Sequence, residues 1–191
     1  LLEQGRIVYI CTNALLMRRK MRDFLAMETI KRPGKAEQWI ERLLQEGLIS
    51  EKDAAEIRKG PRDENRPVIA PSRWLYWNVH LDGLERTHDL IVEREGVFKE
   101  CILAMRMAKI LGYQVATNTT IYKETDMKEI EDLFAYLSTL GIDGHTISPG
   151  YDYDSAKEDM RKRLNLQPEN FFLTRAATKQ KFKDVREWGE R

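Results

Sequence analysis

The chain has 191 residues and a mass of 22.4 kDa; 42% of the residues are hydrophobic and 33% are charged, which predicts one soluble domain with a real core. A net charge of +1 gives no strongly basic surface for nucleic acid, and no apolar run is long enough to span a bilayer. The two cysteines, Cys11 and Cys101, exclude a disulfide scaffold, form no metal-ligand motif and favour a reducing cytoplasm.

The first predicted strand is the nearly continuous apolar and β-branched run at 7–11. Such a run is typical of a strand covered on both faces, as in a parallel sheet. Thr12 and Asn13 end the strand, and the pattern predicts a helix from 14 to 20.

Residues 24–72 interrupt this strand-and-helix rhythm. Apolar positions at helical spacing predict an amphipathic helix over 36–47. Ser50 and Asp53 then predict an N-capped second helix through Lys59. We expect a helical hairpin inserted into a βα connection of one domain, with its charged face either solvated or used as a lid or docking surface.

The remaining elements alternate regularly. Strands are predicted at 74–81, 114–121 and 142–148, and helices at 97–111, 126–140, a short segment capped by Ser155 and Glu158, and from about 174 onward. Asp126 and Glu129 have the spacing of a capping box. Cys101 lies beside the apolar stripe of its helix and is expected to be a small core residue.

The order of elements predicts an α/β fold of four consecutive parallel βα units, either in a doubly wound sheet or in part of a barrel. Polar side chains gather where these strands end, at Cys11, Asn13, His80, Asp82, Asn118 and Ser148. Such an edge can hydrogen-bond a ribose and an amino-acid group. No G-x-G-x-x-G or Walker motif is present, which argues against a dinucleotide or NTP site.

A thiol at the edge, Cys11, has three interpretations: a nucleophile, a hydrogen-atom donor or a buried side chain. No base adjoins it in the sequence, so nucleophilic catalysis has little support.

Four segments resemble the radical S-adenosylmethionine superfamily: VYICTNA at 8–14, WNVHLDGLERTHDLIVEREGVF at 77–98, GYQVATNTT at 112–120 and GIDGHTISPGY at 141–151. Within the superfamily, the combination is most similar to the enzymes that form adenosylhopane in hopanoid biosynthesis. The likeness covers 1–23 and 73–185. Thr-Asn and Leu-Asp-Gly are generic elements, whereas CTNALL, VHLDGL followed by His-Asp, and ISPGY are more specific.

The resemblance implies a partial (β/α)6 barrel that uses S-adenosylmethionine and a four-iron, four-sulfur cluster. It further implies that the following residues line the cofactor or substrate pocket: Asn13, His80, Asp82, Asn118 and Ser148. Many members of the superfamily have Ser where His80 stands, and the chain departs from the family at this position.

The implied reaction adds a 5′-deoxyadenosyl radical to the alkene of a hopene-type lipid. We hypothesise that Cys11 donates the hydrogen atom that quenches the resulting carbon radical. The implied partners are the lipid and an electron donor such as flavodoxin or ferredoxin. A cytoplasmic enzyme with peripheral contact at the inner face of the membrane is expected from this substrate.

The chain departs from the family because it contains neither the C-x3-C-x2-C triplet nor the Gly-Gly-Glu-Pro segment. We expect both to lie upstream of Leu1, in a longer chain, or to be missing from a truncated product. The 191-residue chain alone is expected to bind no cluster and to be inactive. Two alternatives stay open: another radical enzyme that modifies a peptide, and a cluster-less remnant that binds a nucleoside or a partner.

Overall fold

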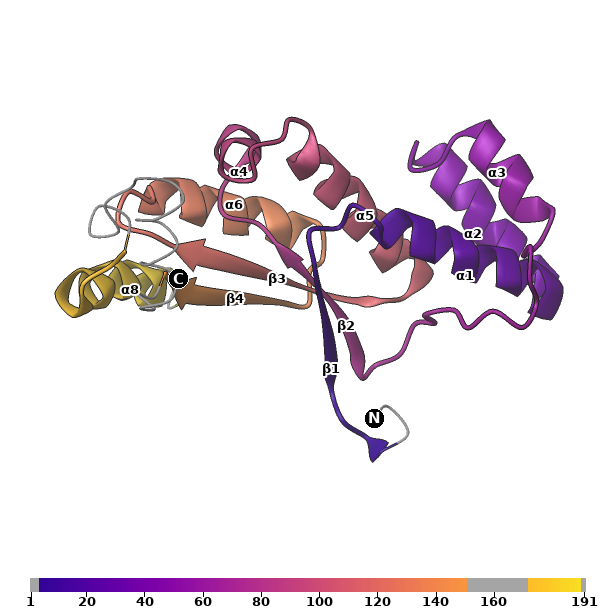
Figure 1. The fold of residues 1–191 in the computed structure, drawn as a ribbon, viewed down its shortest axis with the longest axis horizontal. Coiled ribbons are helices and arrows are strands. Elements are labelled where there is room, and N and C mark those ends of the chain that lie inside the picture. Colours follow the sequence, from indigo (N-terminus) through magenta and orange to yellow (C-terminus); the bar gives the residue numbers. More distant parts are fainter. Residues whose placement is uncertain (1–3, 151–171, 190–191) are drawn as a thin grey trace, which may run out of the picture.

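The computed structural model describes residues 4–150 and 172–189 (Figure 1). The described residues form an α/β fold with one four-stranded parallel sheet and seven helices. The strands are β1 (Val8–Thr12), β2 (Leu75–His80), β3 (Gln114–Ile121) and β4 (Gly144–Pro149). The helices are α1 (Met17–Lys31), α2 (Pro33–Gln45), α3 (Glu51–Arg58), α4 (Glu85–Ile91), α5 (Val97–Leu111), α6 (Met127–Thr139) and α8 (Arg175–Gly189).

The sheet has the order β1-β2-β3-β4, so each strand pairs with its neighbours in the chain. Alternate residues along a strand point to opposite faces. On one face Trp77, Val79 and Val115 are buried in the main hydrophobic core with residues of α1, α5 and α6. Figure 1 shows these three helices along the same side of the strands. The sheet therefore has one face covered by helices.

The opposite face is much less covered within the described residues. Tyr9 is 53% exposed, and Cys11 is exposed as well. We call this side the open face; strand register and alternation place on it Tyr9, Cys11, Tyr76, Asn78, His80, Asn118, Thr146 and Ser148. The run at 7–11 was expected to be covered on both faces. Among the described residues this expectation is wrong, because only one side of β1 packs on helices.

Helix α1 is longer than the sequence predicted, since it continues past Lys20 to Lys31. Met21, Phe24 and Leu25 are fully or almost fully buried and continue the apolar stripe that begins at Met17. Basic residues separate these apolar positions, so the local composition did not predict that the helix continues. Residue 24, the expected start of the insertion, lies within α1.

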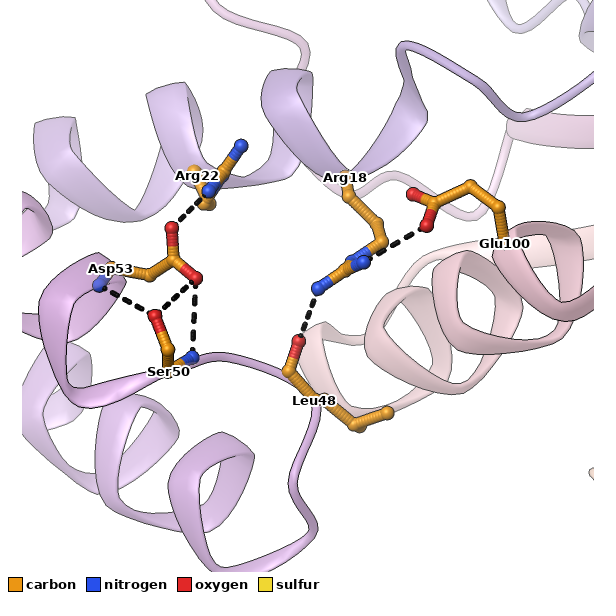
Figure 2. Close-up of polar contacts among 6 residues, drawn as sticks. All are labelled: Arg18, Arg22, Leu48, Ser50, Asp53 and Glu100. Carbon is orange, nitrogen blue, oxygen red and sulfur yellow. Dashed lines mark hydrogen bonds and ion pairs between the residues drawn. The ribbon is translucent and has the colours of Figure 1, made fainter. Parts of the chain in front are cut away.

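The helical unit formed by α2 and α3 packs into the same core as the sheet. Ile40 and Ala54 are completely buried in the cluster that contains Phe24 and Trp77. Arg18 of α1 adds a polar tie: it donates to the Leu48 carbonyl at 2.8 Å and to Glu100 of α5 at 3.0 Å (Figure 2). The α2–α3 connection is thereby fixed to both α1 and α5.

Ser50 and Asp53 form the predicted capping box at the start of α3. The Asp53 N–H donates to Ser50 Oγ, and the Ser50 N–H donates to Asp53 Oδ2, each at 3.1 Å. Figure 2 shows that Asp53 also pairs with Arg22 of α1. The N-terminus of α3 is therefore joined to α1 by a charged contact as well as by apolar packing.

The second predicted capping box, at the start of α6, is wrong. Asp126 does cap the helix by accepting from the Lys128 N–H at 2.9 Å. Glu129, however, points to α4, where its carboxylate accepts from the Leu84 N–H at 2.8 Å and the Thr87 hydroxyl at 2.9 Å. Helix α4 was not predicted at all, because its residues looked like a polar loop. The contact of Glu129 in α6 with Leu84 and Thr87 stabilises the first turn of α4.

The bounds predicted for α5 and β3 agree with the structure, and α8 begins within one residue of its expected start. The short helix expected after Ser155 lies outside the described residues. None of the described helices combines the length and the apolar character needed to cross a membrane.

Candidate functional site

Strand register brings four of the six predicted site residues to the open face. Cys11 is paired with Asn78, His80 with Asn118, and Thr120 with Ser148. These pairings run across all four strands, toward the edge where their carboxyl ends meet. Parallel sheets place ligands at this edge. The predicted gathering of polar groups at the strand ends is therefore present for Cys11, His80, Asn118 and Ser148.

Asn13 lies just beyond β1 and lines a hollow formed by the β1–α1 connection and the start of α5. The hollow is lined by Asn13, Leu15, Leu16, Arg94, Glu95, Gly96, Val97 and Glu100. The Asn13 carbonyl accepts from the Cys101 thiol at 3.5 Å. Ala14, which follows, has a φ of 61°, a left-handed conformation that is unusual for a residue with a side chain. Asn13 is thus held at the edge by a constrained loop.

Asp82 lies beneath the site. Its side chain is 2% exposed, and its Oδ2 lies 2.6 Å from Nε2 of His80, whose side chain is 38% exposed. The Thr120 N–H donates to Asp82 Oδ1 at 2.8 Å. With both oxygens engaged and buried, the carboxylate acts on the site through His80. The hydrogen bond to Asp82 raises the pKa of His80 above its ordinary 6.5.

His88 is a residue that the sequence did not single out. It lies on α4, is fully buried, and accepts at Nδ1 from the Asp82 N–H at 3.3 Å. Burial lowers the pKa of His88, so the imidazole is held neutral. Its Nε2 is buried with no hydrogen-bond partner among the described residues. Two histidines with pKa values shifted in opposite directions therefore flank Asp82. His80 lies at the surface and His88 lies in the core.

The two cysteines have opposite environments. Cys11 is exposed on the open face, and Asn78 Nδ2 donates to its Sγ at 3.6 Å. Cys101 is 0% exposed, which confirms that it is a core residue, and burial raises its pKa to about 12. Of the two thiols, Cys11 is the one accessible to a ligand.

Two amide oxygens on the open face lack partners among the described residues. Oδ1 of Asn118 and Oδ1 of Asn78 are both buried and accept no hydrogen bond. A buried acceptor without a donor is destabilising, so such atoms attract hydroxyl or amino donors of a ligand. The sequence did not predict Asn78 as a site residue, because Asn78 lies in the middle of a strand. The one available indication was a polar residue within an apolar run.

The described residues do not fit an iron–sulfur cluster or another metal centre. No group of three or more His, Cys, Asp or Glu residues in the described ranges is arranged to hold a metal ion. Cys11 lies on the open face, and Cys101 lies in the helix-covered core. The polar groups at the site instead suit an organic ligand with several hydrogen-bond donors.

Comparison with models of known protein families found no match to this chain. A search of curated proteins also found no match.

Proposed function

We propose that this chain is part of a radical S-adenosylmethionine enzyme that adds a 5′-deoxyadenosyl radical to the alkene of a hopene-type lipid, giving adenosylhopane. One observation carries the proposal beyond the sequence resemblance. An exposed thiol, Cys11, shares the open face with His80, Asn118 and Ser148, so a thiol and side chains that can hydrogen-bond a nucleoside lie on one surface.

The sheet topology supports a partial (β/α)6 barrel as the fold. Right-handed connections between sequential parallel strands put all their helices on one face of the sheet. The order β1-β2-β3-β4 has no reversal, which a doubly wound sheet needs in order to place helices on both faces. In a barrel the helix-free face lines the interior, so the open face would be an inner wall.

The adenosyl group would be bound by polar atoms along this wall. Asn118 Oδ1, which is buried and has no hydrogen-bond partner among the described residues, can accept from a ribose hydroxyl or from the adenine amino group. The His80 imidazole, held by Asp82, and the Ser148 hydroxyl offer further hydrogen bonds to the ribose. Asn13 would contact the ligand at the end of β1.

Cys11 would complete the reaction. Addition of the 5′-deoxyadenosyl radical would break the π bond of the alkene, form a carbon–carbon bond with one of its electrons and leave the other as a tertiary carbon radical on the lipid. The Cys11 S–H bond breaks homolytically, the hydrogen atom bonds to that carbon, and a thiyl radical remains on sulfur. One electron from a ferredoxin or flavodoxin and one proton from water restore the thiol.

The four-iron, four-sulfur cluster that the resemblance implies would supply the electron that cleaves S-adenosylmethionine. The described residues do not hold it, and under this proposal its ligands come from outside them. The lipid substrate would also place the enzyme in the cytoplasm, in peripheral contact with the membrane.

The reaction can be tested in the cluster-bearing enzyme with hopene in deuterated water, by mass spectrometry of the product. The proposal expects adenosylhopane with one deuterium at the quenched carbon, because the thiol exchanges with solvent. Cys11→Ala should abolish the saturated product, while Cys101→Ser, which keeps a donor in the core, should retain it. Unchanged saturated product from Cys11→Ala would contradict the proposal.

A further inference from the structure

Cys11 and Asn78 form an in-register pair on neighbouring strands of the open face. Their side chains meet directly, since Asn78 Nδ2 donates to Cys11 Sγ at 3.6 Å. This distance is within the range of hydrogen bonds to sulfur, which are longer than those to oxygen. The sulfur atom therefore acts as an acceptor toward the sheet.

The hydrogen of the Cys11 thiol can point away from Asn78. A thiol whose sulfur accepts from Asn78 keeps its own S–H free to point elsewhere. Asn78 Oδ1, the nearby acceptor that could have bound this hydrogen, is buried and accepts no hydrogen bond from the described residues. On its other side Asn78 is paired with Ala116, whose side chain has no donor for that oxygen. In the part of the chain that the structure describes, Cys11 thus uses its sulfur as an acceptor and keeps its S–H free.

We propose that Asn78 is a positioning residue for Cys11: its amide N–H holds the sulfur in one orientation and leaves the S–H free for hydrogen-atom transfer. This inference rests on the function proposed above. In that reaction a hydrogen atom passes from sulfur to carbon only when the S–H bond points at the carbon radical. A thiol that rotates freely, or donates to a protein oxygen, spends less time in that orientation.

The same contact predicts an effect on thiol reactivity that needs no substrate. The N–H donor fixes the position of the sulfur, which is the atom that alkylating reagents attack. Iodoacetamide alkylation of Cys11 can be followed by mass spectrometry in a Cys101→Ser background of the 191-residue chain. Cys101→Ser keeps a hydroxyl donor opposite the Asn13 carbonyl, so the core contact is preserved.

The variants separate a hydrogen-bonding role from a packing role. Asn78→Ala should slow alkylation roughly fivefold, the ratio expected when one hydrogen bond of ordinary strength is lost. Asn78→Ser should recover part of this loss because a hydroxyl can donate. Asn78→Asp should be slowest, because its carboxylate accepts the S–H. Thr146→Ala, on the same face, should leave the rate unchanged.

Infrared spectroscopy of the S–H stretch shows directly whether the S–H donates a hydrogen bond. Cys11 should show a narrow band of an unbonded S–H in the Cys101→Ser chain, and the band should move to lower frequency in Asn78→Asp. An equal alkylation rate in Asn78→Ala, or an S–H band that Asn78→Asp leaves in place, would overturn the inference. Both measurements omit the nucleoside, so a failure of nucleoside binding would overturn the proposed function alone.

Discussion

Nε2 of His80 lies 2.6 Å from Oδ2 of Asp82, a carboxylate that is almost completely buried. The pair stands at the end of β2, where a backbone N–H from Thr120 of β3 holds the other carboxylate oxygen at 2.8 Å. A half-exposed imidazole is thereby given one orientation and a preference for its charged form. The edge of the open face consequently has a fixed hydrogen-bonding group rather than a mobile side chain.

This pair predicts the titration of His80. The hydrogen bond to Asp82 raises its pKa above 6.5, so its contribution to stability is full below 6.5 and is lost as the pH rises through the raised value. In an NMR titration, the ring proton of His80 should have a midpoint above 6.5. Asp82→Asn should bring the midpoint down, and an identical midpoint in that variant would show that Asp82 does not hold the imidazole.

His88 should behave in the opposite way. Burial lowers its pKa below 6.5, so the unfolded chain takes up a proton first and stability falls as the pH drops from 6.5 toward the lowered value. Chemical denaturation between these limits should show this fall in the native chain and a flatter profile in His88→Leu. Equal slopes for the two chains would mean that His88 is not the group responsible.

Glu129 predicts a stability effect transmitted from α6 to α4. Glu129→Ala removes the acceptor of the Leu84 N–H and of the Thr87 hydroxyl, and should lower the free energy of unfolding by about 1–2 kcal/mol. Glu129→Gln retains one carbonyl acceptor and should lose less. Glu64→Ala, in an exposed loop, is the control for urea denaturation. A loss in the control as large as in Glu129→Ala would contradict this role.

Gly83, within the Leu-Asp-Gly element, predicts a steric effect. A Cβ at this position would lie 2.7 Å from Thr87 Cγ2 and 3.0 Å from Glu129 Oε1. Gly83→Ala should therefore displace the start of α4 and destabilise the chain by about 1–3 kcal/mol. Gly144→Ala is a matched control, because a Cβ there has no heavy atom within 4 Å. If thermal unfolding shows the same change for both variants, the close approach at Gly83 is not important.

The parts of the fold that local sequence predicted are those with strong periodic or turn signals. Helix α5 has a clear apolar stripe and ends at Gly112, whose φ of 85° favours glycine. The capping box of α3 could also be predicted, because Ser50 and Asp53 are close in the sequence and contact each other directly. Such local interactions are encoded within a few residues.

The features that local sequence missed depend on distant partners. Glu129 has capping-box spacing, yet it binds the first turn of α4, more than forty residues away in the chain. His88 looks like part of a polar loop until α4 forms and buries it. At the site, the register of the strands was needed to reveal Asn78 beside Cys11 and to show that Asp82 is buried beneath His80.

The binding of 5′-deoxyadenosine by the 191-residue chain tests most directly whether the open face is an adenosyl site. In isothermal titration calorimetry the account predicts saturable binding at one site, weakened roughly tenfold by Asn118→Ala through loss of an acceptor in a buried setting. Asn65→Ala, the same change in an exposed loop, should bind like the native chain. An absence of saturable binding, or equal affinity in Asn118→Ala and the native chain, would contradict the account.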